Sequence, residues 1–184
     1  MKLSFLFAAA AALLLLVPAA SAQDVPARSN DEARVSPNAG VMQTIGTTDL
    51  EIHYGRPSVN GREIFGGLEP YGQVWRTGAN EATVFSVSSD VMVEGEILPA
   101  GVYGLFTIPG ETEWTIIFNT VAEQWGAYNY DASQDVLRVT AAPVSSATPQ
   151  EQFLISFESV SAGGAVMVLA WDDVRVPVSL STGG

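Results

Sequence analysis

The sequence predicts an all-β protein, a single-domain antiparallel β-sandwich with about nine strands and little helix after the first segment. Three observations predict this fold. Short segments of alternating apolar and polar residues recur about every ten residues, turn-forming Gly, Pro, Asn and Asp separate them, and no helical period is sustained. The pattern fits a jelly-roll and a Greek-key arrangement of the strands equally well.

The first predicted element is a hairpin, and a long loop follows it. Residues 41–45 and 50–54 alternate in hydrophobicity around a short turn, and His53 should point away from the apolar face. Residues 55–72 contain Gly and Pro at many positions, which predicts a loop. This loop also carries large apolar side chains, so we expect it to pack against the sheet.

The remaining strands follow at similar spacing. Trp114 and Phe118 share one face of a strand and should lie in the core, with Ile117 partly buried on the opposite face. An aromatic loop is expected at residues 124–131 and a polar linker near residues 145–150. The strands themselves are expected at residues 82–88, 90–93, 102–108, 114–119, 136–140, 153–158, 165–171 and 174–180.

The chain divides into an export signal, a leader and one domain. Lys2, an apolar run and the small residues 20–22 are typical of a signal peptide over residues 1–22. Residues 23–38 are polar and aperiodic, which predicts a disordered leader, and residues 39–180 form the expected β-sandwich domain. We therefore expect a periplasmic or extracellular protein with no membrane span in the mature chain.

The charge balance excludes several partners. The chain carries 20 Asp and Glu against 8 Lys and Arg, and its formal net charge is −12. Such a surface disfavours nucleic acid and anionic membranes, and it serves solubility. The chain has no Cys, so disulfides and thiol chemistry are excluded and the domain depends on its hydrophobic core.

Familiar catalytic signatures are absent from the sequence. It contains no G-x-S-x-G elbow, no H-E-x-x-H and no P-loop, so we predict no cofactor and assign no catalytic residue. Asn129, Asp131 and Asp135 match part of the spacing of a calcium loop, but the turn Gly and the terminal Glu of such a loop are missing. We interpret these residues as an Asx turn and predict no metal site.

The residues most suited to binding gather in two loops. The segment between His53, the single His, and Glu81 contains three of the seven Arg residues. A guanidinium grips a carboxylate or phosphate through parallel donors, and aromatic rings offer flat surface for a sugar or aromatic ligand. The ligand-binding candidates are His53, Arg56, Arg62, Trp75, Arg76, Asn80, Glu81 and Trp125.

Two interpretations of Arg76 remain open at the level of the sequence. In the structural one, Arg76 pairs with Glu81 or a nearby Asp, Asn80 caps the turn, and Trp75 fills the mouth of the sandwich. In the functional one, Arg76 offers its donors to a ligand beside His53.

Three long motifs resemble a known family. "HYGRPSVNGREIFGGLEPYGQVWRTGANEATVF", "LPAGVYGLFTIPGETEWTIIFN" and "WGAYNYDASQDVLRV" occur in the order found in the bacterial domain of unknown function 2911 family. The resemblance covers about residues 36–177 and implies a secreted single-domain protein, but no activity or catalytic residue. Asn60 stands where family members often have a Lys.

These observations favour one function and leave two alternatives. The first is a secreted or periplasmic module that binds a small polar or anionic ligand, or a glycan, through the Arg, Trp and His loop cluster. The second is a hydrolase or lyase that uses His53 with a carboxylate from Glu81 or Glu63. The third is a structural or assembly module of the cell envelope that docks through an exposed apolar patch made by Phe65, Leu68 and Tyr71.

Overall fold

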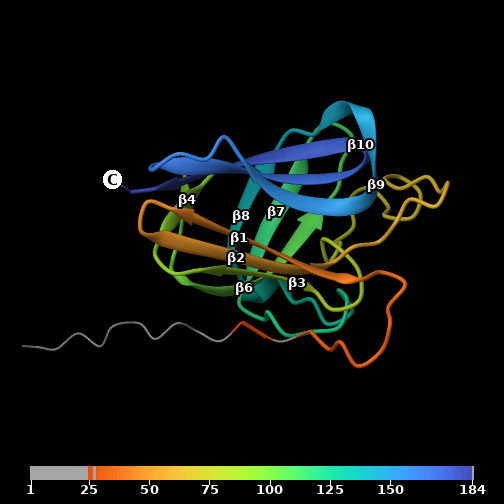
Figure 1. The fold of residues 1–184 in the computed structure, drawn as a ribbon, viewed down its shortest axis with the longest axis horizontal. Coiled ribbons are helices and arrows are strands. Elements are labelled where there is room, and N and C mark those ends of the chain that lie inside the picture. Colours follow the sequence, from red (N-terminus) through yellow and green to blue (C-terminus); the bar gives the residue numbers. More distant parts are fainter. Residues whose placement is uncertain (1–24, 27, 184) are drawn as a thin grey trace, which may run out of the picture.

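A computed structural model describes residues 25–26 and 28–183. It confirms the predicted fold class, because the chain forms two antiparallel β-sheets that pack as a sandwich (Figure 1). The expected signal peptide, residues 1–22, lies outside the described residues. Within the described residues, no helix is long and apolar enough to cross a membrane.

The larger sheet has six strands in the order β1-β2-β3-β6-β7-β8. Alternating burial along β2 confirms that its apolar residues face the core and that His53 faces outward. The strands are β1 (Asn38–Ile45), β2 (Thr48–Gly55), β3 (Thr83–Val87), β6 (Gly101–Ile108), β7 (Trp114–Asn119) and β8 (Asp135–Ala141).

The smaller sheet has four strands in the order β5-β4-β10-β9. It contains β5 (Glu96–Leu98), β4 (Val91–Val93), β10 (Gly164–Thr182) and β9 (Val144–Glu158). The expectation of a polar linker at residues 145–150 was wrong, because this segment belongs to β9 and pairs with β10. Its Pro149 is tolerated because β9 is an edge strand, where a missing backbone donor leaves no ladder bond unmade.

Four aromatic side chains join the two sheets at one end of the core. Trp75 stacks on Trp171 of β10, with ring centroids 5.7 Å apart and an interplanar angle of 18°. Phe65 lies edge-on to both of these rings and to Trp114 of β7. Phe65 comes from the long loop at residues 55–72, so the prediction that this loop packs against the sheet is confirmed.

The end of β2 crosses from one sheet to the other. The hydroxyl of Tyr54 donates to the carbonyl of Ile155 and accepts from its amide, at 3.4 and 3.1 Å. Three residues after Tyr54, the carbonyl of Pro57 accepts from the amide of Phe153 at 2.9 Å. These contacts give the outer edge of β9 backbone partners and close one side of the sandwich.

A second, smaller apolar cluster lies on the outer face of the six-stranded sheet. Phe106, Ile117 and Ala82 are fully buried there. Residues Ala127 and Tyr130, from the loop between β7 and β8, pack over them. This loop therefore covers part of the face that alternation along the strands directs away from the main core.

The segment before β1 lies on the domain. Arg28, inside the expected disordered leader, is 9% exposed and donates hydrogen bonds to the backbone of the sheet ends. The structure therefore differs from the expectation of disorder for residues 28–37. Charged side chains bind this segment to the domain, although it has no apolar periodicity.

Substitution Tyr54→Phe tests the link between the sheets. It should lower the free energy of unfolding by about 1–3 kcal/mol, because the buried amide of Ile155 loses its partner. Urea unfolding measures this change. The control Tyr128→Phe removes a hydroxyl from a side chain that is 83% exposed and should change stability by less than about 0.5 kcal/mol. Equal effects of the two substitutions would show that the hydroxyl of Tyr54 does not link the sheets.

Candidate functional site

Hydrogen bonds from buried residues fix the turn that connects Trp75 to β3. Trp75 exchanges two backbone hydrogen bonds with Thr107 of β6, at 2.7 and 2.9 Å. Its buried indole N–H donates to the carbonyl of Gly78 at 3.1 Å. The hydroxyl of Thr83 donates to the carbonyl of Thr77 at 2.6 Å, which closes the turn on itself. Trp75, a ligand-binding candidate, is thus a core residue.

The backbone of this turn adopts unusual dihedral angles. Thr77 and Asn80 have φ values of 53° and 66°, in the left-handed region that non-Gly residues rarely occupy. Gly55, at the end of β2, lies directly against the carbonyl of Ala79, so closely that any side chain at position 55 would collide with it. The turn therefore presents its carbonyl groups in a fixed arrangement.

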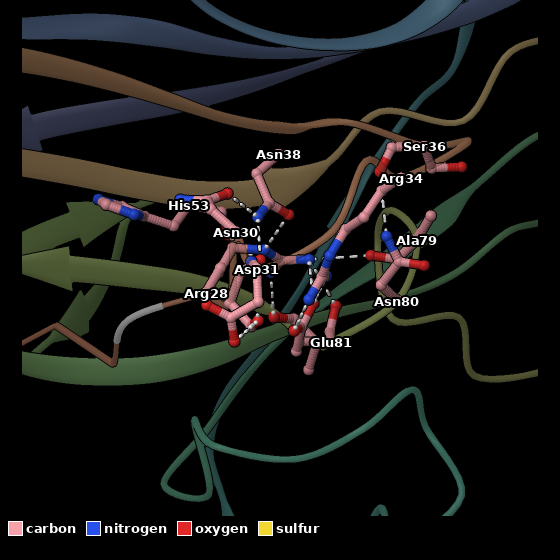
Figure 2. A network of polar contacts seen from close by, with 12 residues as sticks. Arg28, Asn30, Asp31, Arg34, Ser36, Asn38, His53, Ala79, Asn80 and Glu81 are labelled. Atoms are coloured by element: carbon pink, nitrogen blue, oxygen red, sulfur yellow. Dashed lines mark hydrogen bonds and ion pairs between the residues drawn. The ribbon is translucent and has the colours of Figure 1, made fainter.

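Arg28 inserts its guanidinium among these carbonyls (Figure 2). Nη1 donates to the carbonyl of Ala82 at 2.9 Å, and Nη2 donates to the carbonyls of Ala79 and Glu81 at 2.9 and 3.1 Å. Nη1 also reaches the carbonyl of His53 at 3.5 Å. We call the carbonyls of these four residues, His53, Ala79, Glu81 and Ala82, the carbonyl cage.

The carboxylate of Glu81 joins two cations from the N-terminal segment. Arg34 binds it in a bidentate pair, with Nη1–Oε2 and Nη2–Oε1 distances of 2.6 and 2.9 Å. Arg28 approaches the same carboxylate at 3.3 Å. Asn80, beside them, donates from Nδ2 to the carbonyl of Ser36 at 3.0 Å, so it ties down the segment instead of capping its own turn.

The charges of this network shift its pKa values. The hydrogen bond from Arg34 is the main cause that lowers the pKa of Glu81 below its usual range. Burial is the main cause that lowers the pKa of Arg28 to about 10, with the nearby cations Arg34 and Arg76 contributing in the same direction. Arg28 still carries its charge at neutral pH, so the cage holds a cation.

Arg76 makes no pair with Glu81, so the structural interpretation of Arg76 was wrong in this respect. Arg34 and Arg28 occupy that carboxylate. The Nε of Arg76 is buried and has no hydrogen-bond partner among the described residues. Each of the other six Arg residues donates to at least one described partner.

Glu69 is the nearby carboxylate that interacts with Arg76. Burial raises the pKa of Glu69 to about 7, although the charges of Arg76 and Arg62 oppose this rise. No hydrogen bond or ion pair within the described residues joins Glu69 to Arg76. Because this pKa lies near 7, Glu69 is only partly ionised at neutral pH and neutralises the charge of Arg76 incompletely.

The two other Arg candidates serve the fold. Arg56 donates from Nε to the carbonyl of Phe153 in β9, at 2.9 Å. Arg62 donates from Nε and Nη2 to the carbonyls of Val59 and Ser58, at 3.0 and 2.5 Å. Arg56 thus satisfies a carbonyl on the edge strand β9, and Arg62 satisfies two loop carbonyls.

Among the described residues, no hydrogen bond joins the side chain of His53 to the Arg residues that the sequence grouped with it. Its Nε2 contacts Oε1 of Glu51 at 2.5 Å, whereas Glu63 and Glu81 were the expected partners. The reason is local, because residues two apart on a strand point to the same face. About a third of each side chain is exposed on the outer face of β2.

The loop between β7 and β8 borders the turn. The amide of Ala82 donates to the carbonyl of Gln124 at 2.9 Å, and the amide of Gly126 donates to the carbonyl of Asn80. The side chain of Trp125, between them, is 56% exposed, while the other three Trp residues are buried. The Oε1 of Gln124 is buried without a hydrogen-bond partner among the described residues.

The expected Asx turn lies in the same loop. The Oδ1 of Asp131 accepts from the amide of Ser133 at 2.9 Å and caps the short helix η1 (Ala132–Gln134). Asp135 instead accepts from Arg138, Tyr130 and Asn119. Within residues 25–26 and 28–183, no group of three acidic, His or Cys side chains is arranged to hold a metal ion.

Most of the predicted ligand-binding residues therefore belong to separate contacts, and a few lie together. Asn80 and Glu81 share one network, and Arg76 and Trp125 flank it from two neighbouring segments. Sequence reasoning missed Arg28 and Arg34 as members of this network. A signal was present in the sequence, since two of only seven Arg residues occur in a short polar segment, but it did not identify their partners.

Comparison with known proteins identifies a family without an assigned activity. The family described as "Protein of unknown function (DUF2911)" matches residues 36–180, as the three long motifs suggested. No curated protein and no solved structure matches the chain.

Proposed function

Because the chain belongs to the DUF2911 family, whose description assigns no activity, we propose from the geometry that it is an exported module that binds a small anionic ligand through Arg76. One observation carries this proposal. Arg76 is the single Arg without a described hydrogen-bond partner, although Glu81 lies five positions along the chain and attracts two other Arg residues.

A buried donor without a partner is costly. Leaving such a group unsatisfied costs about 1–3 kcal/mol, and more when the group is charged. Folded proteins keep such a donor where it binds a water or an ion, or where it serves a function. A carboxylate or phosphate satisfies two donors of a guanidinium together, so an anion beside Arg76 would supply partners that the described residues do not.

The surroundings of Arg76 favour a ligand with more than an anionic group. Gln124 supplies a buried acceptor, and the backbones of Arg76 and Gln124 are both hydrogen-bonded to the dipeptide at residues 82–83. A hydroxyl or ammonium group on the ligand would satisfy this acceptor. Trp125 adds exposed aromatic surface next to Gln124, which suits the ring of an acidic sugar.

The alternative functions have less support. His53 and Glu51 form the contact expected of a base and the carboxylate that orients it. The carboxylate of Glu81, one of the two expected partners, instead binds Arg34 and Arg28. For a docking module, Phe65 of the expected patch packs into the core, and Leu68 and Tyr71 are each only about two-fifths exposed. A small-ligand site at Arg76 accounts for the unpaired donor, which neither alternative does.

Substitution Arg76→Gln tests the anion site. Calorimetric titration with sodium glucuronate, lactate and inorganic phosphate should show binding of at least one of them to the wild-type protein. The substitution should weaken it about 10- to 100-fold, because a charge-assisted hydrogen bond contributes about 1.5–3 kcal/mol. The control Arg175→Gln makes the same charge change at the exposed pair with Glu158 and should leave binding unchanged. Equal binding to both variants would refute the role of Arg76.

The pH dependence of binding tests the contribution of Glu69. Affinity for the anion should fall as pH rises through about 7, because Glu69 becomes charged beside Arg76. Glu69→Gln should remove this fall, whereas His53→Gln should retain it.

The pH dependence of stability tests the same carboxyl group. Glu69 has a folded-state pKa above its unfolded value, so wild-type stability should decrease between about pH 4.5 and 7 relative to Glu69→Gln. Parallel curves for the two proteins would show that Glu69 is ionised throughout.

Export is tested with the full chain in a Gram-negative host. The protein should appear in the periplasm or medium with an N-terminus near Gln23, as expected from the signal peptide at residues 1–22. Leu14→Arg places a charge in the apolar run and should keep the protein inside the cell. Recovery of uncleaved wild-type chain in the cytoplasm would contradict export.

A further inference from the structure

The carbonyl cage has the composition of a cation site rather than of an ordinary turn. Four backbone carbonyls and one carboxylate converge on the guanidinium of Arg28, whose side chain is only 4% exposed (Figure 2). Carbonyl oxygens accept hydrogen bonds and cannot donate them. The cage therefore suits a group that carries several donors and a positive charge.

The cage is built by the domain and not by the segment that fills it. The carbonyls come from the end of β2 and from the turn at residues 77–82. Contacts of that turn with Trp75, Thr83 and Gly55 hold its strained backbone, and none of these contacts involves the N-terminal segment. Backbone strain of this kind gathers at ligand clamps, because the surrounding structure has to maintain it.

The N-terminal segment behaves as a tethered ligand. Residues 28–37 contain no helix or strand, and Arg28 and Arg34 supply their charged contacts with the domain. Ten positions separate Arg28 from Asn38, the first residue of β1. So short a tether gives Arg28 a high effective concentration at the cage.

We propose that the carbonyl cage is a preformed guanidinium-binding site, that Arg28 of the same chain occupies it, and that it accepts a guanidinium from solution when Arg28 is removed. The planar guanidinium presents donors in several directions, and the contacts of Arg28 use Nη1 for Ala82 and Nη2 for both Ala79 and Glu81. A primary ammonium has the same charge but only three donors on one atom, so the site discriminates against it.

Chemical rescue of Arg28→Ala tests this site. The melting temperature of the full-length variant should fall by roughly 5–10 °C, because the carboxylate of Glu81 and the carbonyls lose a buried cation. Millimolar N-ethylguanidinium should recover at least a third of that loss, and ethylammonium at the same concentration should recover none. Wild-type protein and Arg175→Ala should respond to neither compound, since their cages are filled. Recovery by both cations, by neither, or an equal response of wild-type protein would overturn the proposal.

A second variant keeps the test decisive if Arg28→Ala does not fold. Arg28→Lys retains the charge without the planar group, and it should expose the bond after Arg34 to trypsin at least 10-fold faster than in the wild type. An unchanged cleavage rate would show that the guanidinium is not required. Sizing chromatography of wild-type protein and Arg28→Lys should give one species of monomer size. A wild-type dimer that dissociates on this substitution would show that a second copy supplies Arg28, which would refute occupation by the same chain.

Discussion

The position of Trp75 is the constraint on which both the core and the candidate site depend. Its ring stacks on Trp171 of the opposite sheet and contacts Phe65, so it belongs to the contact between the layers. Its indole N–H and its backbone hold the turn that begins at Thr77. One buried side chain thus sets the spacing of the sheets and the orientation of the carbonyls at their end.

The distribution of Arg residues follows from what each guanidinium can reach. Arg56 and Arg62 satisfy carbonyls of the edge strand β9 and of a loop, and Arg28 and Arg34 bind the network at Glu81. In a chain with a net charge of −12, each cation has many acidic partners available. Arg76 nevertheless has no partner among the described residues, and burial raises the pKa of Glu69 near it, which are the observations behind the proposed anion site.

The two proposed sites have opposite chemistry and lie on the same short stretch of chain. Arg76 offers donors to an anion, and the carbonyls that follow it at residues 79–82 offer acceptors to a cation. Burial is the main cause that lowers the pKa of Arg28, and the charge of Arg76 contributes in the same direction. Arg28 occupies the carbonyls of the turn, and Arg34 and Arg28 occupy the carboxylate of Glu81, so these acceptors are not paired with Arg76.

The sequence by itself determined most of the strands, their inward faces and the fold class, because alternation along a strand is local and appears directly in the order of residues. Residues 145–150 of β9 are polar and lack this alternation, so the sequence did not predict them as strand. It also placed Trp114 and Phe118 in the core and identified Arg76 and Glu81 as the residues to follow. Only the tertiary structure decided the partners of these charges. Arg34 and Glu81 are 47 positions apart, and they meet because the N-terminal segment folds back over the end of the sheet. No local pattern records such a contact, since sheet order and turn conformation bring the two segments together.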